Sequence, residues 1–138
     1  MRLVIDTNVV ASGIFFGGKP RELLNLLFQR KVEVYASPDI IAEYQETFDY
    51  LVNKYPNRLV NTPVSQIALA CRIIEPTSDI HVCRDPDDDK FISCAVDGRC
   101  IYVVSGDKDL LVLEEYKGIE IITVADFFKR LLDFENTQ

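Results

Sequence analysis

The chain alternates short apolar runs with longer segments in which apolar residues recur at helical spacing. Four mainly apolar runs are short enough to be buried strands, and they occupy residues 2–5, 32–35, 101–104 and 119–122. A leucine-rich segment from about residue 20 to residue 29 follows a loop at 17–20 and predicts a helix. The pattern therefore predicts strands that are separated by helices along the chain.

Capping residues indicate where further helices begin and end. Ser37, Thr62 and Asp85 each precede a proline, and a capping side chain followed by proline is typical of a helix N-terminus. We expect the second of these helices to end near residue 73 and the third to stop at Gly98. A short helix is expected between the last two strands, and Thr123 predicts the start of a final helix.

The arrangement of these elements predicts the fold class. Strands that alternate with helices and lack an alternating polar face are typical of a parallel sheet covered on both sides. The predicted fold is α/β, a three-layer α/β/α sandwich with a central, mostly parallel sheet, in a single domain over residues 1–138. In such sheets, ligands bind at the carboxyl ends of the strands.

Composition adds limits to this picture. The chain is 48% hydrophobic and 27% charged, as in an ordinary globular protein. No apolar run approaches the roughly 20 residues that span a bilayer, and Asp6 interrupts the first apolar run too early for a signal peptide. We therefore expect a cytoplasmic protein with no membrane partner. The net charge of −7 argues by itself against nucleic-acid binding, but this argument weakens if cations neutralise some carboxylates.

The cysteines and the single histidine do not form a zinc pattern. Cys71, Cys83, Cys94 and Cys100 include no CxxC pair, and three of them lie in apolar stretches. Such residues are usually small core side chains in a reducing compartment. His81 is two residues from Cys83, but no second ligand pair accompanies them.

Acidic residues follow two of the predicted strands. Asp6 comes directly after the first strand, and Asp107 and Asp109 follow the run at 101–104 after Ser105 and Gly106. Since the carboxyl ends of parallel strands lie at one edge of a sheet, these carboxylates are expected close together. Asp6 has an alternative interpretation as a simple helix cap.

Further acids lie on the predicted helices. Glu43 flanks the apolar side of its helix, where a carboxylate is unfavourable unless it is compensated or reaches solvent. Asp85, Asp87, Asp88 and Asp89 crowd the start of another helix, which is more acid than capping requires. Both Asp88 and Asp89 have a spacing that points them along the buried side of that helix.

The type of ligand indicates the chemistry. Oxygen ligands without His or Cys favour Mg²⁺ or Mn²⁺ over zinc, and a carboxylate-bound cation of this kind suits hydrolysis of a phosphodiester bond. With one histidine in the chain, no Ser–His or Cys–His set competes with this interpretation. The segment GGKP is not a phosphate-binding P-loop, because it lacks the GxxxxGK[ST] spacing.

Four motifs give the chain a resemblance to a known family. VIDTNVV, SPDIIAEY, DDDKFISCA and VVSGDKDLL occur in order and span nearly the whole chain. Through them the chain resembles the PIN-domain family, the nuclease fold of VapC-type toxins in toxin–antitoxin systems. It looks most like a subfamily described as toxin components, in which a DPDD run precedes the third acid. The resemblance implies a Mg²⁺- or Mn²⁺-dependent endoribonuclease, a homodimer and an inhibitory antitoxin partner.

The resemblance also implies roles for individual residues. The catalytic and metal-binding acids that it implies are Asp6, Glu43, Asp89 and Asp107. Asp89 is favoured over Asp88 by its spacing to Asp107, and Asp88 is kept as a supporting residue. Asn8 and Ser105 match polar residues that orient the acids or a metal-bound water, with Ser105 at a position where Thr is commoner. Apart from the resemblance, Lys19, Arg84, Lys90 and Lys108 lie beside the proposed site in sequence and are candidates to hold substrate phosphates.

Two other functions remain open at this point. The first is a non-catalytic module that uses the same fold to bind RNA or a protein. The second is a receiver-type phosphoacceptor domain, which also gathers acids at strand ends and requires a lysine after a later strand. That reading leaves Glu43 without a role, and Lys108 here lies between two aspartates.

Overall fold

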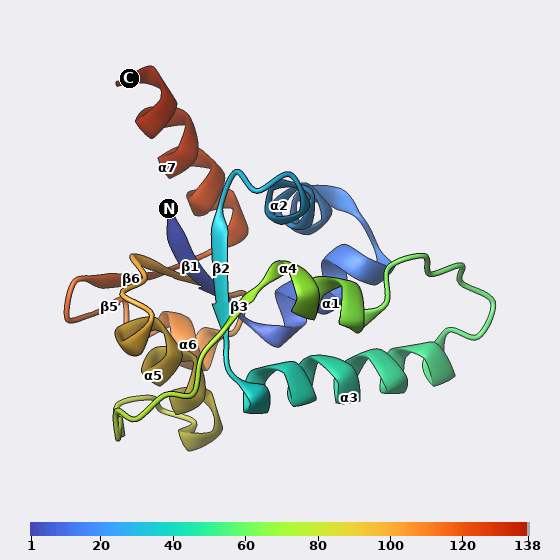
Figure 1. Ribbon diagram of the computed structural model, residues 1–138, viewed down its shortest axis with the longest axis horizontal. Coiled ribbons are helices and arrows are strands. Elements are labelled where there is room, and N and C mark those ends of the chain that lie inside the picture. Colours follow the sequence, from blue (N-terminus) through green and yellow to red (C-terminus); the bar gives the residue numbers. More distant parts are fainter. Residues whose placement is uncertain (138) are drawn as a thin grey trace.

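A computed structural model describes residues 1–137, and its strands form one sheet with the order β3-β2-β1-β4-β6-β5 (Figure 1). The strands are β1 (Arg2–Ile5), β2 (Glu33–Ala36), β3 (Arg72–Ile73), β4 (Tyr102–Val104), β5 (Glu115–Tyr116) and β6 (Ile119–Ile122). The helices are α1 (Thr7–Phe15), α2 (Gly18–Phe28), α3 (Pro38–Lys54), α4 (Val64–Ala70), α5 (Asp89–Asp97), α6 (Lys108–Leu111) and α7 (Val124–Asn136), with a 3₁₀ turn η1 (Pro86–Asp88) directly before α5. Neighbouring strands pair in parallel except for β5 and β6, which are antiparallel.

The chain reverses its direction across the sheet between β3 and β4. It first moves from β1 through β2 to β3, and it then returns so that β4 pairs with the other side of β1. Because parallel crossovers are right-handed, the reversal places α5 on the opposite face from α1 and α2. In Figure 1, α5 lies to the left of β1 and β2, and α1 and α2 lie to the right. The predicted α/β sandwich with a mostly parallel central sheet is confirmed.

The predicted helix starts depended on four capping side chains, and three of these caps are present. Thr62 is not a cap, because α4 begins after Pro63 without a side-chain cap and Thr62 Oγ1 accepts a hydrogen bond of 2.8 Å from Arg21. Ser37 and Thr123 each accept a hydrogen bond from a backbone N–H in the first turn of α3 and α7, and Asp85 does the same for η1. Gly98 ends α5 as predicted, but the residue with a positive φ is Arg99 (φ 54°). Glycine is needed at position 98 for close packing, because a Cβ there would lie 2.8 Å from a tyrosine ring of β2.

The structure differs from the predicted elements in three places, one of which is the short strand β5 that was not predicted. The helix expected to reach residue 73 ends at Ala70, and Arg72 and Ile73 instead pair with β2 as the edge strand β3. The free edge of β2 gives these residues partners, and such tertiary pairing outweighs local pattern. Helix α1 was not predicted, because its valines and threonine have only weak helix preference.

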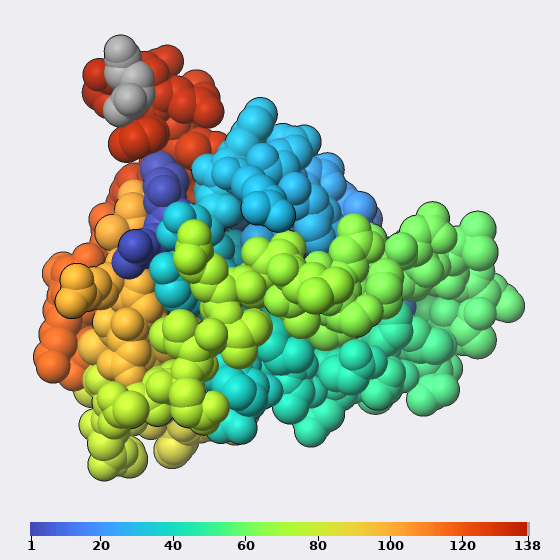
Figure 2. All heavy atoms as spheres, in the orientation of Figure 1, coloured from blue at the N-terminus to red at the C-terminus, as the bar shows by residue number. Residues whose placement is uncertain are grey.

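The core lies between the sheet and the helices on each face. Leu3, Val4 and Ile5 of β1 are completely buried. Cys94 and Cys100 are core residues as predicted, and burial raises the pKa of each thiol to about 12. The C-terminal half of α7 and the segment around residues 50–62 project from this body (Figure 2). Within residues 1–137, no helix has both the length and the apolar character to cross a membrane.

Helices α1 and α2 are packed closely at Gly13. A Cβ at this position would lie 2.7 Å from Leu24 Cδ1 and 2.8 Å from the carbonyl oxygen of Pro20. We expect Gly13→Ala to lower the free energy of unfolding by about 1–3 kcal/mol, because the helices must move apart. Urea denaturation measures this change. Gly106→Ala is the control, since a Cβ there meets nothing within 4 Å, and equal stability of the two variants would contradict the prediction.

Candidate functional site

The order of the strands puts a topological switch point at the carboxyl ends of β1 and β4, and we refer to this place as the crevice. The chain leaves β1 toward β2 and leaves β4 toward β6, in opposite directions across the sheet, and ligands bind at such a switch point in open α/β sheets. Asp6 is the first residue after β1, and Ser105 is the first after β4. The fold therefore brings together two polar residues that are 99 positions apart in the sequence.

Asp6 is buried, with only 4% of its surface exposed. It stands at the N-cap position of α1, but its side chain makes no capping hydrogen bond in that helix. Its Oδ2 instead accepts a hydrogen bond of 2.7 Å from Ser105 Oγ. Burial raises the pKa of Asp6, and the nearby carboxylates of Asp107 and Glu43 raise it further, while the hydrogen bond from Ser105 lowers it. The alternative interpretation of Asp6 as a simple cap does not fit this arrangement.

Ser105 joins the ends of the two strands. Its side chain is completely buried, and the Oγ that donates to Asp6 also accepts a hydrogen bond of 2.9 Å from the backbone N–H of Asp107. Asp107 in turn caps α6, since its Oδ1 accepts from the backbone N–H of Asp109 at 2.9 Å. Asp107 Oδ2 forms no hydrogen bond with any residue between 1 and 137, and Ser105 fixes the backbone that carries it.

Glu43 reaches the crevice from α3. Its Oε2 accepts a hydrogen bond of 2.9 Å from Thr7 Oγ1 and lies 3.1 Å from Lys90 Nζ. Lys90 also pairs with Asp87 at 3.2 Å. The neighbouring Tyr44 donates a hydrogen bond of 2.5 Å to the carbonyl oxygen of Ile5, which fixes α3 against the end of β1. One oxygen of Glu43 is thus already held by an ammonium group.

The structure places Asp88 and Asp89 in different surroundings. Asp89 Oδ1 accepts hydrogen bonds from the backbone N–H groups of Val82 and Cys83, at 3.1 and 2.9 Å. These bonds lower its pKa against the effect of burial, which acts in the opposite direction. Asp89 therefore holds the loop before η1 in place. The spacing to Asp107 in the sequence instead predicts Asp89 as the third metal ligand.

Asp88 faces the crevice. It is 6% exposed, and its Oδ2 is buried without a hydrogen-bond partner among residues 1–137. Burial raises the pKa of Asp88 to about 7, and the nearby carboxylates of Asp107 and Asp6 add to the rise. An unpaired buried carboxylate oxygen is unfavourable unless a cation or a proton neutralises it. Asp88, and not Asp89, thus shares its surroundings with Asp6 and Asp107.

This raised pKa predicts how stability depends on pH in the absence of divalent cations. The unfolded chain releases the Asp88 proton near its usual pKa of 3.8, whereas the folded protein keeps it until about pH 7. The folded state binds more protons over this interval, so stability falls as pH rises and levels off above about pH 7. Thermal unfolding in EDTA measures the trend. Asp88→Asn should show a clearly flatter profile between pH 5 and 7, and identical profiles would contradict the prediction.

The other polar and basic residues predicted for the site are dispersed. Asn8 is exposed on the first turn of α1. Lys19 lies over the ring of Phe128 on α7, with Nζ 5.4 Å from the centroid. Arg84 is paired with Asp109 at 2.6 Å. Lys108 is exposed and forms no ion pair with any residue in the described part of the chain. Only Lys90 contacts one of the predicted acids.

Sequence reasoning missed Thr7, which lies beside Asp6 and positions Glu43. It is 4% exposed and donates its hydroxyl across the crevice. A signal for Asp88 was present in the sequence, since Phe91, Ile92 and Ala95 lie three, four and seven positions later and are all buried. Among the residues at the same spacings after Asp89, only Ile92 is buried. A count of helical neighbours thus favours Asp88 as the inward-facing acid.

The donor atoms in the crevice suit a hard divalent cation. Within residues 1–137, no three His, Cys, Asp or Glu side chains are already arranged as a metal site. Asp88 Oδ2 nevertheless lacks a hydrogen-bond partner among residues 1–137, and the carboxylates near it are those of Asp6 and Asp107. A divalent cation would supply the partner and offset the like-charge repulsion. The donor chemistry of these residues therefore fits Mg²⁺ or Mn²⁺, which favour carboxylate oxygens.

Comparison with known proteins shows the family of the chain. The chain belongs to the PIN domain family, whose model matches residues 2–109 and so includes every residue of the crevice. It is 36% identical over 129 residues to the uncharacterized protein MJ1680 of Methanocaldococcus jannaschii, an alignment that covers 88% of this chain and 81% of that protein. No solved structure gives a significant match. PIN domains are generally metal-dependent nucleases, so the chain has a nuclease-type fold.

Proposed function

We propose that the chain is a Mg²⁺- or Mn²⁺-dependent endoribonuclease that hydrolyses RNA phosphodiester bonds. The observation that carries this proposal is the buried, unpaired Oδ2 of Asp88 beside the carboxylates of Asp6 and Asp107. Three carboxylates gathered beside the ends of β1 and β4 repel one another, and this repulsion destabilises the fold. They become favourable when they share a cation.

The proposed cation ligands are Asp6, Asp88 and Asp107, with Asp88 taking the place that the sequence interpretation gave to Asp89. A cation held by these residues would supply a Lewis acid for the phosphodiester and would lower the pKa of an attacking water. Ser105 orients this set, since it bonds both the Asp6 carboxylate and the Asp107 backbone. The proposed cation ligands Asp6 and Asp107 are thus oriented by the buried hydroxyl of Ser105 rather than by a charged side chain.

Glu43 and Lys90 are proposed to act at the open side of the crevice. Thr7 and Lys90 hold the same carboxylate oxygen of Glu43, which leaves the other oxygen for a cation or a water. Lys90 is partly exposed, so its ammonium group is available to a substrate phosphate beside the carboxylates. Lys108, which is exposed at the start of α6, is proposed to bind a phosphate from the other side.

The cellular role that we propose is that of the toxin in a toxin–antitoxin pair, acting in the cytoplasm as a homodimer that an antitoxin protein inhibits. The support is the resemblance of its four motifs to VapC-type toxins. Expression from an inducible promoter in a bacterial host tests it: growth arrest with the native chain and normal growth with Asp6→Asn are expected. Equal arrest with both chains would contradict a role that depends on RNA cleavage.

The activity itself is tested with an end-labelled, unstructured RNA. We expect cleavage with millimolar Mg²⁺ or Mn²⁺, none in EDTA, and none of a DNA of the same sequence. A second candidate is a non-catalytic RNA- or protein-binding module, which is favoured by the occupation of one Glu43 oxygen by Lys90. That alternative predicts intact RNA in every condition and RNA or partner binding that survives loss of the carboxylates.

Removal of the Ser105 hydroxyl should weaken metal binding. Ser105→Ala leaves the Asp6 carboxylate without its donor and the Asp107 N–H without its acceptor. Loss of a group that orients metal ligands typically lowers metal affinity by about 10- to 100-fold. Isothermal titration with Mn²⁺ measures this change, with Ser65→Ala on the exposed surface of α4 as control. Unchanged Mn²⁺ affinity in Ser105→Ala would contradict the assigned role.

A further inference from the structure

Five basic side chains gather at the amino ends of the parallel strands, at the opposite edge of the sheet from the carboxylates. Arg2 and Arg72 are the first residues of β1 and β3, Arg30 and Lys31 precede β2, and Arg99 precedes β4. Since consecutive amino ends of parallel strands lie side by side, residues from four separate segments meet on one surface. We refer to these five residues as the basic groove.

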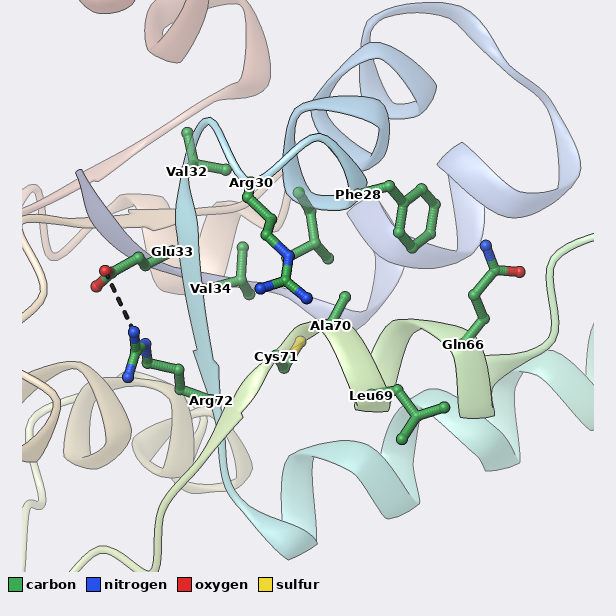
Figure 3. Close-up of a pocket in the computed structure, with 11 residues that line it drawn as sticks. Phe28, Arg30, Val32, Glu33, Val34, Gln66, Leu69, Ala70, Cys71 and Arg72 are labelled. Atoms are coloured by element: carbon green, nitrogen blue, oxygen red, sulfur yellow. Dashed lines mark ion pairs between the residues drawn. The ribbon is translucent and has the colours of Figure 1, made fainter.

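The surface between these side chains is hollow. One hollow of about 560 Å³ lies between α2, β2 and α4 and is bordered by Arg30 and Arg72. A second of about 450 Å³ is bordered by Arg2, Lys31 and Arg99. Arg30 lines both, so they adjoin. Figure 3 shows the Arg30 guanidinium directed into the first hollow.

The charge of the groove differs in sign from that of the whole protein. Glu33 is the one carboxylate among its lining residues in the described part of the chain, and it is shared by Arg2 at 3.3 Å and Arg72 at 3.6 Å. Arg30, Lys31 and Arg99 form no ion pair with any residue between 1 and 137. The chain as a whole carries −7, so positive charge is concentrated at this edge.

Two of the arginines occupy positions that disfavour them. Arg30 and Arg99 follow the ends of α2 and α5 and have φ values of 59° and 54°. Glycine or asparagine is the usual residue in this left-handed conformation, because a larger side chain is strained there. The two helices lie on opposite faces of the sheet, yet both end in an arginine that contributes to the same groove.

We propose that the basic groove binds the phosphate backbone of RNA, as a second contact surface for the substrate of the proposed ribonuclease on which this inference rests. Four of its five cations are arginines, whose planar guanidinium binds two phosphate oxygens at once. Phe28, Gln66 and Leu69 border the same hollow, and Leu69 is 88% exposed. They offer an aromatic ring, an amide and an apolar side chain to the bases.

The position of the groove fits a substrate that also reaches the carboxylates. The amino and carboxyl ends of the parallel strands are separated by the length of β1, which has four residues and is therefore about 13 Å long. A few nucleotides span such a distance. A net negative protein would repel RNA near its acidic edge, so a basic surface at the other edge supplies the attraction that brings the substrate to the protein.

The test uses variants that remove charge without harming the backbone. Arg30→Gly and Arg99→Gly put the preferred residue at both left-handed positions, so the double variant should melt at the same temperature as the native protein or higher. The control is Lys117→Gly with Lys129→Gln. Lys117 also has a positive φ of 50°, both lysines are exposed, and neither borders the groove.

Binding is measured by fluorescence anisotropy of a 20-nucleotide oligouridylate in EDTA, where no cleavage occurs. We expect the Arg30→Gly/Arg99→Gly protein to bind at least about 10-fold more weakly at moderate salt, with a salt dependence shallower by about 1.4 in log–log slope for two lost phosphate contacts. The lysine control should bind within about twofold of the native protein. Native-like affinity of the arginine variant would overturn the proposal. So would displacement of the RNA by poly-L-glutamate as readily as by unlabelled oligouridylate, because the groove would then be a site for an acidic polypeptide.

This result is independent of catalysis. If the native protein cleaves no RNA in Mg²⁺ or Mn²⁺ but its binding in EDTA depends on Arg30 and Arg99, the ribonuclease proposal fails and the groove stands. If the protein cleaves RNA and the arginine variant binds normally, the groove fails and the ribonuclease proposal stands.

Discussion

Asp6→Asn should reduce metal-dependent RNA cleavage by at least about 100-fold. Asp6 is buried at the end of β1, its pKa is raised by burial and by two neighbouring carboxylates, and Ser105 orients it. Asparagine keeps the shape but supplies no negative charge to a cation. The rate constant for cleavage of an end-labelled RNA in saturating Mn²⁺ measures the effect.

The same substitution should leave the metal-free protein at least as stable as the native one. It removes a charge that is buried beside like charges, so thermal unfolding in EDTA should show an equal or higher midpoint. Asp133→Asn, on the exposed surface of α7, is the control for cleavage. Full activity of Asp6→Asn, or a loss explained by unfolding, would contradict the role assigned to Asp6.

Asp88→Asn should mainly reduce RNA cleavage, whereas Asp89→Asn should mainly reduce the stability of the fold. Asp88→Asn removes the unpaired carboxylate oxygen in the crevice, so cleavage should fall by at least about 100-fold with little loss of stability. Asp89→Asn weakens the bonds that hold the backbone of Val82 and Cys83. It should lower the free energy of unfolding by about 1–3 kcal/mol and keep cleavage within a few-fold of native.

The two variants are a matched pair, because they are the same chemical change at adjacent positions. Cleavage rates and urea denaturation on both proteins separate the two roles. The reverse pattern, with an inactive Asp89→Asn and an active Asp88→Asn, would restore the assignment made from sequence spacing. Inactivity of both with native stability would mean that both carboxylates serve the cation.

Much of the fold was predictable because the chain marks its own elements. The apolar run before Asp6 predicted β1, and Ser37 and Thr123 placed the starts of α3 and α7 through their capping hydroxyls. These signals are local, since a cap and the N–H that it binds lie within one turn. Strand β3 was missed because it depends on the distant free edge of β2.

The part of the candidate site that lies at the ends of strands was predictable from the sequence. Asp6, Ser105 and Asp107 could be placed together because each follows an apolar strand, and the sheet order then brings β1 beside β4. The spacing to Asp107 favoured Asp89 as the third acid, whereas the spacing to the apolar residues of α5 favoured Asp88. In the structure the backbone of residues 82–83 donates to the Asp89 carboxylate, which supports Asp88 as the proposed ligand.

The basic residues were predicted from closeness in sequence, which is a poor guide to closeness in space. Lys19 lies against α7 and Arg84 is paired with Asp109, whereas Lys90 contacts Glu43. The basic groove has no local signal at all, because it combines the first residues of strands with the ends of two helices on opposite faces. Only the order of the strands in the sheet reveals it.

The most direct test of the account is the anomalous diffraction of crystals grown with Mn²⁺. The account predicts a Mn²⁺ peak in the crevice, with oxygens of Asp6, Asp88 and Asp107 at bonding distances of about 2.2 Å and with Asp89 still bonded to the backbone at residues 82–83. A crevice that holds no Mn²⁺ at millimolar concentration, or a peak coordinated by Asp89 without Asp6, would contradict it.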